Sequence, residues 1–251
     1  MINDLLNSMN PITLDEMHGI RLMDRIDSKF VASVSFLPRI LEEATPCFRV
    51  QMVNDFKISR YCTQYLDTPD LDMFTMHQNG KLNRQKIRIR SYMESNLSFL
   101  EVKNKNNRSR TKKIRIPISR THVCSVEELM DEKLFLNENS IFNAGDLRPV
   151  LANDFKRITL VNNRKTERVT IDIDLSFHNY VSGGQKDLGD VMIIELKQDG
   201  WQHSDFRDIL MQLRIKKMSF SKYCMGTVLT NPNVKYNRFK RRCTLINKLI
   251  K

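Results

Sequence analysis

Charged and aliphatic residues alternate along several segments of this chain, and this pattern restricts its fold more than any other feature. In the segment Phe99–Ile118, for example, Glu101 and Lys103 alternate with Leu100 and Val102. A period of two residues is that of a pleated β-strand, in which successive side chains point to opposite faces. The segment therefore predicts two charged strands joined by a polar turn.

Other segments repeat this pattern and carry both signs of charge on one face. Lys86, Arg88 and Arg90 share one face of the strand predicted over residues 81–92. Further strands of this kind are predicted over residues 25–30, 111–118, 167–175 and 190–198. Because an ordinary strand turns its charges to bulk water, the repetition suggests a sheet whose polar face lines an interior space.

The strand count predicts a mainly-β α+β fold, an antiparallel sheet of about eight strands interrupted by roughly three amphipathic helices. Helix starts are indicated by Pro38 in the first turn of a helix, by the capping box Ser125–Glu128 and by the cap Ser204. A barrel of about eight strands encloses a space that side chains or one small ligand can fill. We therefore expect an eight-stranded antiparallel tunnel barrel with amphipathic helices packed outside and at its ends.

The charged faces are expected to point into the barrel. Five aliphatic residues would then point outward beneath the helices: Ile87, Ile89, Val102, Ile171 and Ile194. Burying so many charges without partners costs too much free energy to be stable. A hydrated tunnel that holds a polyanion and a metal ion resolves this conflict.

The charge of the whole chain agrees with a polyanionic ligand. Its 251 residues carry a formal net charge of +12, which favours nucleic acid, an anionic membrane surface or phosphorylated small molecules. Charge alone does not choose among these. We expect no nucleic acid partner, because the aromatic signatures of RNA-binding domains and zinc-finger spacing are absent from the sequence.

The cysteines and the N-terminus suggest a cytoplasmic protein without a transmembrane segment. The five cysteines are odd in number and lack metal-binding spacing, so a disulfide framework or a structural zinc site is not expected. The N-terminal residues are acidic and lack the features of a signal peptide. No apolar run approaches the roughly 20 residues that span a bilayer.

Seven motifs, taken in order, resemble a known family. They are RIDSKF, YLDTPD, KIRIRSY, FLEVKNK, ERVTIDIDL, IIELKQ and SFSKYCMG. Together they resemble the VTC-type polyphosphate polymerase domain of the triphosphate tunnel metalloenzymes, a CYTH-like superfamily, in a stand-alone bacterial form. The resemblance implies a single domain over residues 1–251, with a core over about 21–226 and a basic C-terminal tail over 232–251.

The resemblance also implies an activity and its cofactor. Members of this branch transfer the terminal phosphoryl group of ATP to a growing polyphosphate chain, using a divalent cation, Mn²⁺ or Mg²⁺. ATP and inorganic polyphosphate or pyrophosphate would then be the ligands, and a membrane-protein partner is left open.

The site residues follow from the matching motifs. The expected catalytic cations are Lys29, Arg88, Arg90, Lys103, Arg168 and Lys222. The expected substrate-binding cations are Lys86, Arg157, Lys197, Lys113 and Arg115. Glu195 is expected to bind the metal, with Glu101 or Asp172 reached through water.

Two other functions stay open. The first strand reads Arg25-x-Asp27-x-Lys29, so it lacks the first carboxylate of the ExExK motif of the wider superfamily. This departure favours the polymerase branch over the hydrolytic and cyclase branches. The alternatives are a tunnel hydrolase for triphosphate or tripolyphosphate, and a non-catalytic module that binds polyphosphate or nucleotide.

Each candidate also has a simpler interpretation. Arg88 and Arg90 could be exposed strand residues that pair with acids across the sheet, and Glu195 could only neutralise Lys197. Cys224 is expected to be a packing residue. Other groups are expected at the surface, in the core or at the tunnel entrance: the histidines, Arg108, Arg110, Lys112 and the basic run Lys240–Arg242.

Overall fold

The computed structural model describes residues 1–18, 20, 25–107, 111–119 and 130–250. Its centre is a sheet in which eight antiparallel strands follow the order β2-β11-β9-β8-β4-β5-β6-β7. Their bounds are β2 Arg25–Ser33, β4 Ser59–Asp67, β5 Arg84–Tyr92, β6 Leu97–Lys105, β7 Thr111–Ile118, β8 Arg148–Asn162, β9 Glu167–Asn179 and β11 Val191–Asp199. Three short strands join its margins: β1 (Pro11–Ile12), β3 (Phe48–Gln51) and β10 (Gln185–Leu188). The predicted antiparallel sheet of eight strands and the mainly-β class are confirmed.

The described residues contain eight α-helices, so the prediction of roughly three was too low. They are α1 Ile2–Ser8, α2 Leu14–His18, α3 Leu37–Ala44, α4 Asp72–Gln78, α5 Met130–Asn139, α6 Asp205–Gln212, α7 Lys222–Thr230 and α8 Lys240–Leu249. The predicted cap of α6 is confirmed, because the Ser204 side chain accepts a hydrogen bond from the backbone N–H of Arg207. The capping box at residues 125–128 lies outside the described residues. None of the helices in the described part of the chain is long and apolar enough to cross a membrane.

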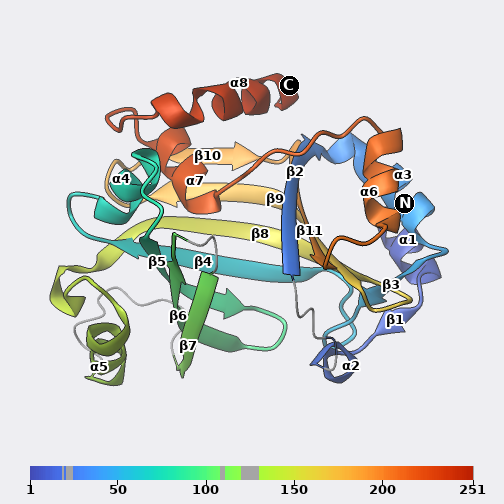
Figure 1. Ribbon diagram of the computed structural model, residues 1–251, viewed down its shortest axis with the longest axis horizontal. Helices are drawn as coiled ribbons and strands as arrows, with labels where there is room; N and C mark the ends of the chain where they lie inside the picture. The colour runs from blue at the N-terminus through green and yellow to red at the C-terminus, as the bar shows by residue number, and fades with distance from the viewer. Residues whose placement is uncertain (19, 21–24, 108–110, 120–129, 251) are drawn as a thin grey trace.

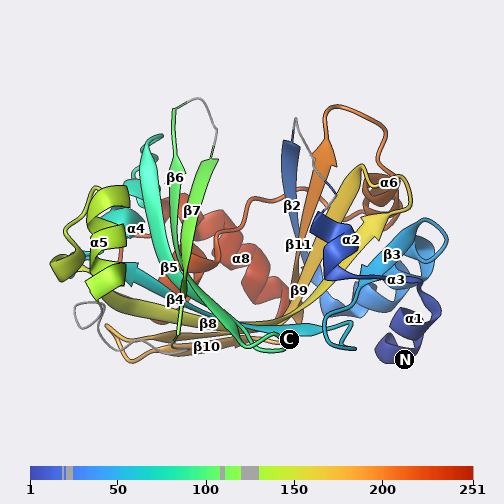
Figure 2. The same ribbon diagram turned by 90° about the horizontal axis from the view of Figure 1, so that it is seen from below.

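The sheet is U-shaped in section rather than the closed barrel that the strand count predicted. Figure 2 shows β4 and β8 as the floor, β5, β6 and β7 as one wall, and β2 and β11 as the other. Among the described residues, no pairing joins β2 to β7, the strands at the two ends of the order. Closure depends on strand tilt and stagger, which alternation along single strands does not specify.

The register of the strands defines an inner and an outer face of the U. The five aliphatic residues predicted to point outward share the outer face and are buried: Ile87, Ile89, Val102, Ile171 and Ile194. Apolar residues of α1, α3 and α6 cover the outer face around Ile171 and Ile194, whereas α4 and α5 cover Ile87 and Val102. Each fully buried side chain of this kind contributes about 1.5–3 kcal/mol. This burial leaves the charged residues on the inner face.

A bulge in β9 changes the facing predicted for its second half. Alternation predicts Asp174 on the same face as Asp172. Asp174 instead has a φ of 51°, and the register between β8 and β9 shifts at this point. Its carboxylate pairs on the outside with Lys156 at 3.0 Å, and Leu175 faces the interior instead. A bulge adds one residue and inverts the facing beyond it.

Helix α7 packs against one end of the U, over β8 and β9 (Figure 1). The Tyr223 ring stacks on Tyr65 of β4 with centroids 5.0 Å apart, and its hydroxyl donates to Asp67. Gly226 allows the close approach, because a Cβ there would lie 2.4 Å from the ring of Phe177. The helix therefore has a fixed position from which its first residue, Lys222, faces β9.

The residues before α7 form a strap (residues 217–221) from one wall to the other. Lys217 forms an antiparallel bridge with Phe30 of β2, and the N–H of Met218 donates to the carbonyl of Lys29 at 2.8 Å. At the far end of the strap, Ser221 accepts a hydrogen bond from Lys86 Nζ of β5 at 2.9 Å. The strap thus connects two strands that are far apart in the sheet.

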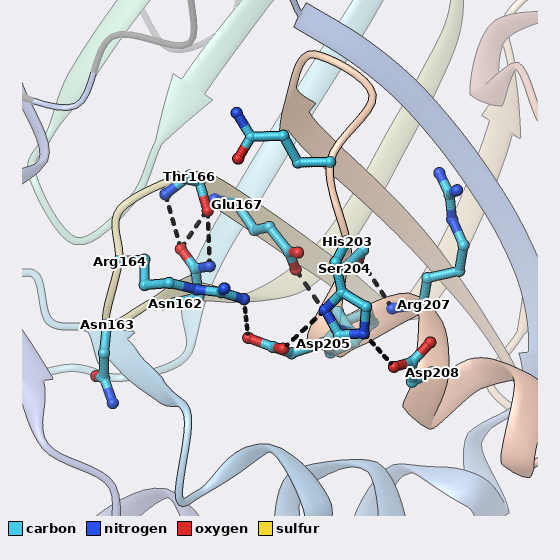
Figure 3. A network of polar contacts seen from close by, with 12 residues as sticks. Asn162, Asn163, Arg164, Thr166, Glu167, His203, Ser204, Asp205, Arg207 and Asp208 are labelled. Atoms are coloured by element: carbon cyan, nitrogen blue, oxygen red, sulfur yellow. Dashed lines mark hydrogen bonds and ion pairs between the residues drawn. The ribbon is translucent and has the colours of Figure 1, made fainter.

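A polar network fixes the turn between β8 and β9 to the start of α6 (Figure 3). Arg164 in the turn pairs with Asp205 at 2.7 Å, and the buried Glu167 accepts a hydrogen bond from the N–H of Phe206 at 3.4 Å. His203 lies between Asp205 and Asp208. These contacts hold α6 against the sheet but lie away from the inner face.

Candidate polyanion-binding site

The register brings the candidate strand residues to the inner face. Lys29 lies opposite Glu195, and Lys197 opposite Arg168, on β2, β11 and β9. In the other wall, the cross-strand rows are Lys86 with Lys103 and Lys113, and Arg88 with Glu101 and Arg115. On the floor, Arg157 lies opposite Asp172. Arg90 shares the face of Arg88, and Lys222 reaches the same face from α7.

Glu101 is fully buried in the wall formed by β5, β6 and β7. Its carboxylate accepts from Arg88 Nε at 2.7 Å and from Lys113 Nζ at 3.0 Å. Burial alone would raise the pKa of Glu101, but the charges of Arg88, Arg90 and nearby lysines outweigh it and lower the pKa to about 2. Glu101 is therefore a permanent anion whose two oxygens already have partners.

Asp172 is held in the same way on the floor of the U. Arg157 binds it with two hydrogen bonds, of 2.5 Å and 2.8 Å, and Lys222 donates to the same carboxylate. Burial opposes ionisation, but the charges of Arg157 and Lys222 hold the pKa of Asp172 far below its usual range. This pair joins the N-terminus of α7 to the sheet.

Glu195 is held more loosely than the other two carboxylates. Lys29 Nζ lies 3.4 Å from one oxygen and Lys197 Nζ lies 3.3 Å from the other. The side chain of Glu195 is 22% exposed, against 0% for Glu101 and 4% for Asp172. Burial would raise the pKa of Glu195, but Lys29 and Lys197 hold it well below its usual range. Of the three, Glu195 has the most room for another ligand.

Cations without acidic partners remain beside these clusters. No hydrogen bond or ion pair engages the Lys103 ammonium in the part of the chain that the structure describes. Burial, then the charges of Arg88 and Arg90, lower the pKa of Lys103 to about 5. Burial and the charges of Arg88 and Arg157 likewise lower the pKa of Arg90 to about 10. Such crowding of like charges is relieved by an anion bound between them.

Aromatic rings form part of the inner face and support the cations. Tyr61 of β4 stacks on Phe155 of β8 with centroids 5.1 Å apart. Arg157 lies over Tyr61 at 4.9 Å, and Lys222 Nζ lies over Phe155 at 4.0 Å. Cation–π contacts of this kind favour a positive charge over the ring face. The rings orient the cations without neutralising them.

Sequence reasoning missed these supporting residues. Tyr61 and Thr63 lie on β4, whose faces the sequence analysis did not assign; Thr63 accepts a hydrogen bond from Arg90 Nε at 3.1 Å. Ser221 and Tyr223 lie within the SFSKYCMG motif, where only Lys222 was selected. Alternation could have identified Tyr61 and Thr63. The roles of Ser221 and Tyr223 depend on contacts with distant strands.

The carboxylates fit a metal ion only in part. Among the described residues, no three His, Cys, Asp or Glu side chains come together as a metal-binding group. The oxygens of Glu101 and Asp172 are occupied by cations, which leaves Glu195 as the fitting ligand. Mg²⁺ and similar ions are commonly held by one or two carboxylates together with substrate phosphates and water. The donor set fits a metal that binds with its substrate.

Several other residues lie apart from this cluster. Cys224 is fully buried with its Sγ 2.9 Å from His77 Nδ1, and burial raises the pKa of its thiol, the reverse of what a nucleophile needs. Arg108 and Arg110, proposed for the tunnel entrance, lie outside the described residues. The run Lys240–Arg242 begins α8 rather than a free tail.

A family model described as the VTC domain matches residues 24–231. Solved structures similar to this chain include putative adenylyl cyclases from Hippeastrum and from Vibrio parahaemolyticus. The Hippeastrum protein, described as having a dominant triphosphatase activity, is 12% identical with a TM-score of 0.50, covering 82% of this chain and 96% of its own. The Vibrio protein is 11% identical with a TM-score of 0.48, and the match covers 82% of this chain and 99% of the Vibrio chain. A search of curated proteins found no match.

Proposed function

Because this chain belongs to the VTC domain family, which includes polyphosphate polymerases and triphosphatases, we propose that it is a metal-dependent polyphosphate polymerase. It would transfer the γ-phosphoryl group of ATP to the terminal phosphate of a polyphosphate chain on the inner face of the U. An oxygen of that terminal phosphate attacks the γ-phosphorus, the bond to the β-phosphate oxygen breaks, and ADP leaves.

The cations of the inner face support the charge neutralisation that this reaction needs. Phosphoryl transfer depends mainly on positioning and on stabilising charge on the transferring group. Arg88 and Arg90 offer planar guanidinium groups for phosphate oxygens, and Lys103 offers an ammonium without a carboxylate partner. Lys29 and Lys222, at opposite ends of the strap, would contact the same chain of phosphates.

One observation carries the choice of polymerase over hydrolase. Glu101, Asp172 and Glu195 each contact two cations, which lower their pKa values and make them weak general bases. A water nucleophile must lose protons, which a general base can accept, whereas a terminal phosphate is already ionised at neutral pH, since the second pKa of a phosphate monoester is about 6. The ion pairs therefore suit a phosphate nucleophile better than water.

The divalent cation would bind at Glu195 together with phosphate oxygens. When bound, it would neutralise part of the negative charge on the phosphates. Lys29 and Lys197 would have to move from the Glu195 carboxylate toward the phosphates. They now lie 3.4 Å and 3.3 Å from the Glu195 carboxylate.

The test is the product formed by purified protein from ATP with Mn²⁺ or Mg²⁺. We expect acid-stable polymer, seen as the resonance of internal phosphates in ³¹P NMR, with ADP released in equal amount to the phosphate incorporated. Release of orthophosphate from ATP or tripolyphosphate without polymer would instead establish a hydrolase. Binding without turnover, across metals and primers, would establish a binding module.

Variants connect the activity to the inner face. Lys103→Ala and Glu195→Gln should each lower kcat by at least about 100-fold, as is typical when one preorganised charge is removed. Lys156→Ala is the matched control, because Lys156 lies on the outer face of the same sheet in an exposed ion pair with Asp174. If Lys156→Ala lowered kcat as much as Lys103→Ala, the assignment of the activity to the inner face would be wrong.

A further inference from the structure

A second group of cations lies at the border of the strap, apart from the carboxylate clusters of the inner face. It consists of Arg84 at the start of β5, and of Arg238 and Arg242 from the C-terminal segment formed by η3 (Asn237–Phe239) and α8. The two C-terminal arginines lie beyond residues 24–231, which the family model covers. They are therefore a feature of this chain outside the matched domain.

The C-terminal segment is packed in place through aromatic contacts. The ring of Phe239 stacks on Phe74 of α4 with centroids 6.2 Å apart and meets the edge of His77 at 5.9 Å. Phe239 and Ile246 are both buried in the larger apolar core. The backbone that carries the basic side chains of this segment is therefore held in place by packing.

The contacts of these arginines are with carbonyl, hydroxyl and glycine groups rather than with acids. Arg242 donates from Nε to the carbonyl of Ser219 at 2.8 Å, and from Nη2 to its hydroxyl at 2.6 Å. Arg84 donates to the carbonyl of Lys81 at 2.7 Å. The guanidinium of Arg238 lies against Gly80, where a Cβ would come within 2.4 Å of Nη1. In the described part of the chain, none of the three arginines has an ion pair with a carboxylate.

The three arginines lie close together, because Arg238 and Arg84 contact the adjacent residues Gly80 and Lys81, and Arg242 Nη1 donates to the carbonyl of Arg238 at 3.0 Å. Burial, then the charges of Lys86, Arg84, Arg238 and Arg242, lower the pKa of His77 to about 2. The histidine is therefore neutral at physiological pH and adds no charge of its own. The surplus of positive charge at this point comes from long side chains that solvent reaches.

We propose that Arg84, Arg238 and Arg242 form a second phosphate-binding site, beyond the Lys86 end of the inner-face clusters, for the part of a polyphosphate chain that extends past the strap. Arg84 is two residues from Lys86 on the same face of β5, and Arg242 holds Ser219 of the strap itself. A chain leaving the inner face beside Lys86 would meet these guanidinium groups next. The ligand's identity rests on the proposed function; the site itself rests on three neighbouring guanidinium groups that have no carboxylate partner among the described residues.

Binding without metal or ATP tests this site separately from turnover. The double variant Arg84→Gln/Arg238→Gln should weaken binding of long-chain polyphosphate by about tenfold, the loss of roughly one charge-assisted contact, and leave tripolyphosphate affinity unchanged. The slope of log Kd against log salt should also become shallower. Arg241→Gln, an exposed neighbour on α8, is the control and should bind both ligands as the wild type does.

Two outcomes would overturn the proposal. If the Gln double variant lost affinity equally for tripolyphosphate and for long chains, the arginines would belong to the inner-face site or to a pocket for free phosphate anions. Unchanged long-chain binding, with loss of binding to phosphatidylserine vesicles, would make the patch a membrane-binding surface. Arg84→Lys/Arg238→Lys keeps the charge and should retain more of the long-chain affinity than the Gln double variant; an affinity equal to that of the Gln variant would contradict binding through charge. A wild-type protein that binds polyphosphate but makes no polymer would contradict the proposed polymerase activity without affecting the evidence for this second binding site.

Discussion

At the scale of single residues, Lys103 shows how stability and ligand binding oppose each other on the inner face. Its ammonium lies between Arg88, Arg90 and Lys113, and its nearest acid, Glu101, is already bound by two of them. The ligand-free protein therefore disfavours the charged form of Lys103. A bound phosphate would reverse that preference.

Lys103→Met should stabilise the ligand-free protein while it abolishes activity. The pKa of Lys103 is lowered to about 5 in the folded protein. Between about pH 5 and 10.5, the unfolded chain therefore holds a proton on Lys103 that the folded protein has lost. The stability of the wild type accordingly rises with pH across this window. The gain in the free energy of unfolding caused by Lys103→Met should thus be large at pH 7 and shrink toward pH 10. In thermal melts, each kcal/mol should raise Tm by about 2–4 °C. Lys156→Met, on the outer face, should show no such pH-dependent gain.

Tripolyphosphate binding should take up protons at Lys103. A phosphate beside Lys103 raises the pKa of its ammonium from about 5, so the complex holds more protons than the free protein. The affinity for tripolyphosphate should therefore fall as pH rises above about 5. Calorimetry in buffers of different ionisation enthalpy measures the uptake. Lys103→Arg stays charged throughout and should take up fewer protons. The same uptake in both proteins would show that Lys103 does not contact the phosphates.

Much of the facing of single residues was predictable, but their partners were not. Alternation alone predicts that Lys86, Arg88 and Arg90 share a face opposite Ile87 and Ile89. Which cation meets which acid depends on the register between strands that are distant in sequence. Asp174 was misassigned because a bulge is a property of the strand pair and not of one strand's pattern.

At the scale of elements, α7 determines how the inner face is completed at one end. It brings Lys222 to Asp172 and Tyr223 to Asp67, and Gly226 lets it approach β8 and β9. Its buried residues surround the helix axis, so it lacks the amphipathic period that identifies a surface helix. For this reason no helix was predicted here, although Ser221 is a good N-cap.

Gly226→Val should destabilise the protein and lower activity together. The first added carbon would lie 2.4 Å from Phe177 and 2.7 Å from Leu151, and overpacking of this kind costs typically about 1–3 kcal/mol. The displaced helix would also move Lys222 from Asp172. Urea denaturation measures the loss. Gly189→Val is the control, because a Cβ at Gly189 meets only Asp187, at 3.5 Å; equal destabilisation in both variants would contradict the packing argument.

At the scale of the whole molecule, the fold separates two environments across one sheet. Helices bury the aliphatic outer face, and the inner face holds cations in excess of carboxylates, consistent with the net charge of +12. The strand count and the antiparallel order of the sheet were predictable from local patterns. Closure was not, because whether β2 meets β7 depends on curvature accumulated over the whole sheet.

The central claim is that the inner face binds a chain of phosphates, and a crystal structure with a non-hydrolysable ATP analogue and Mn²⁺ tests it most directly. We predict phosphate density between Arg88, Lys103 and Lys222, with the metal bound to Glu195 and to phosphate oxygens. Phosphates bound only on the outer face, or anywhere away from these cations, would contradict the claim.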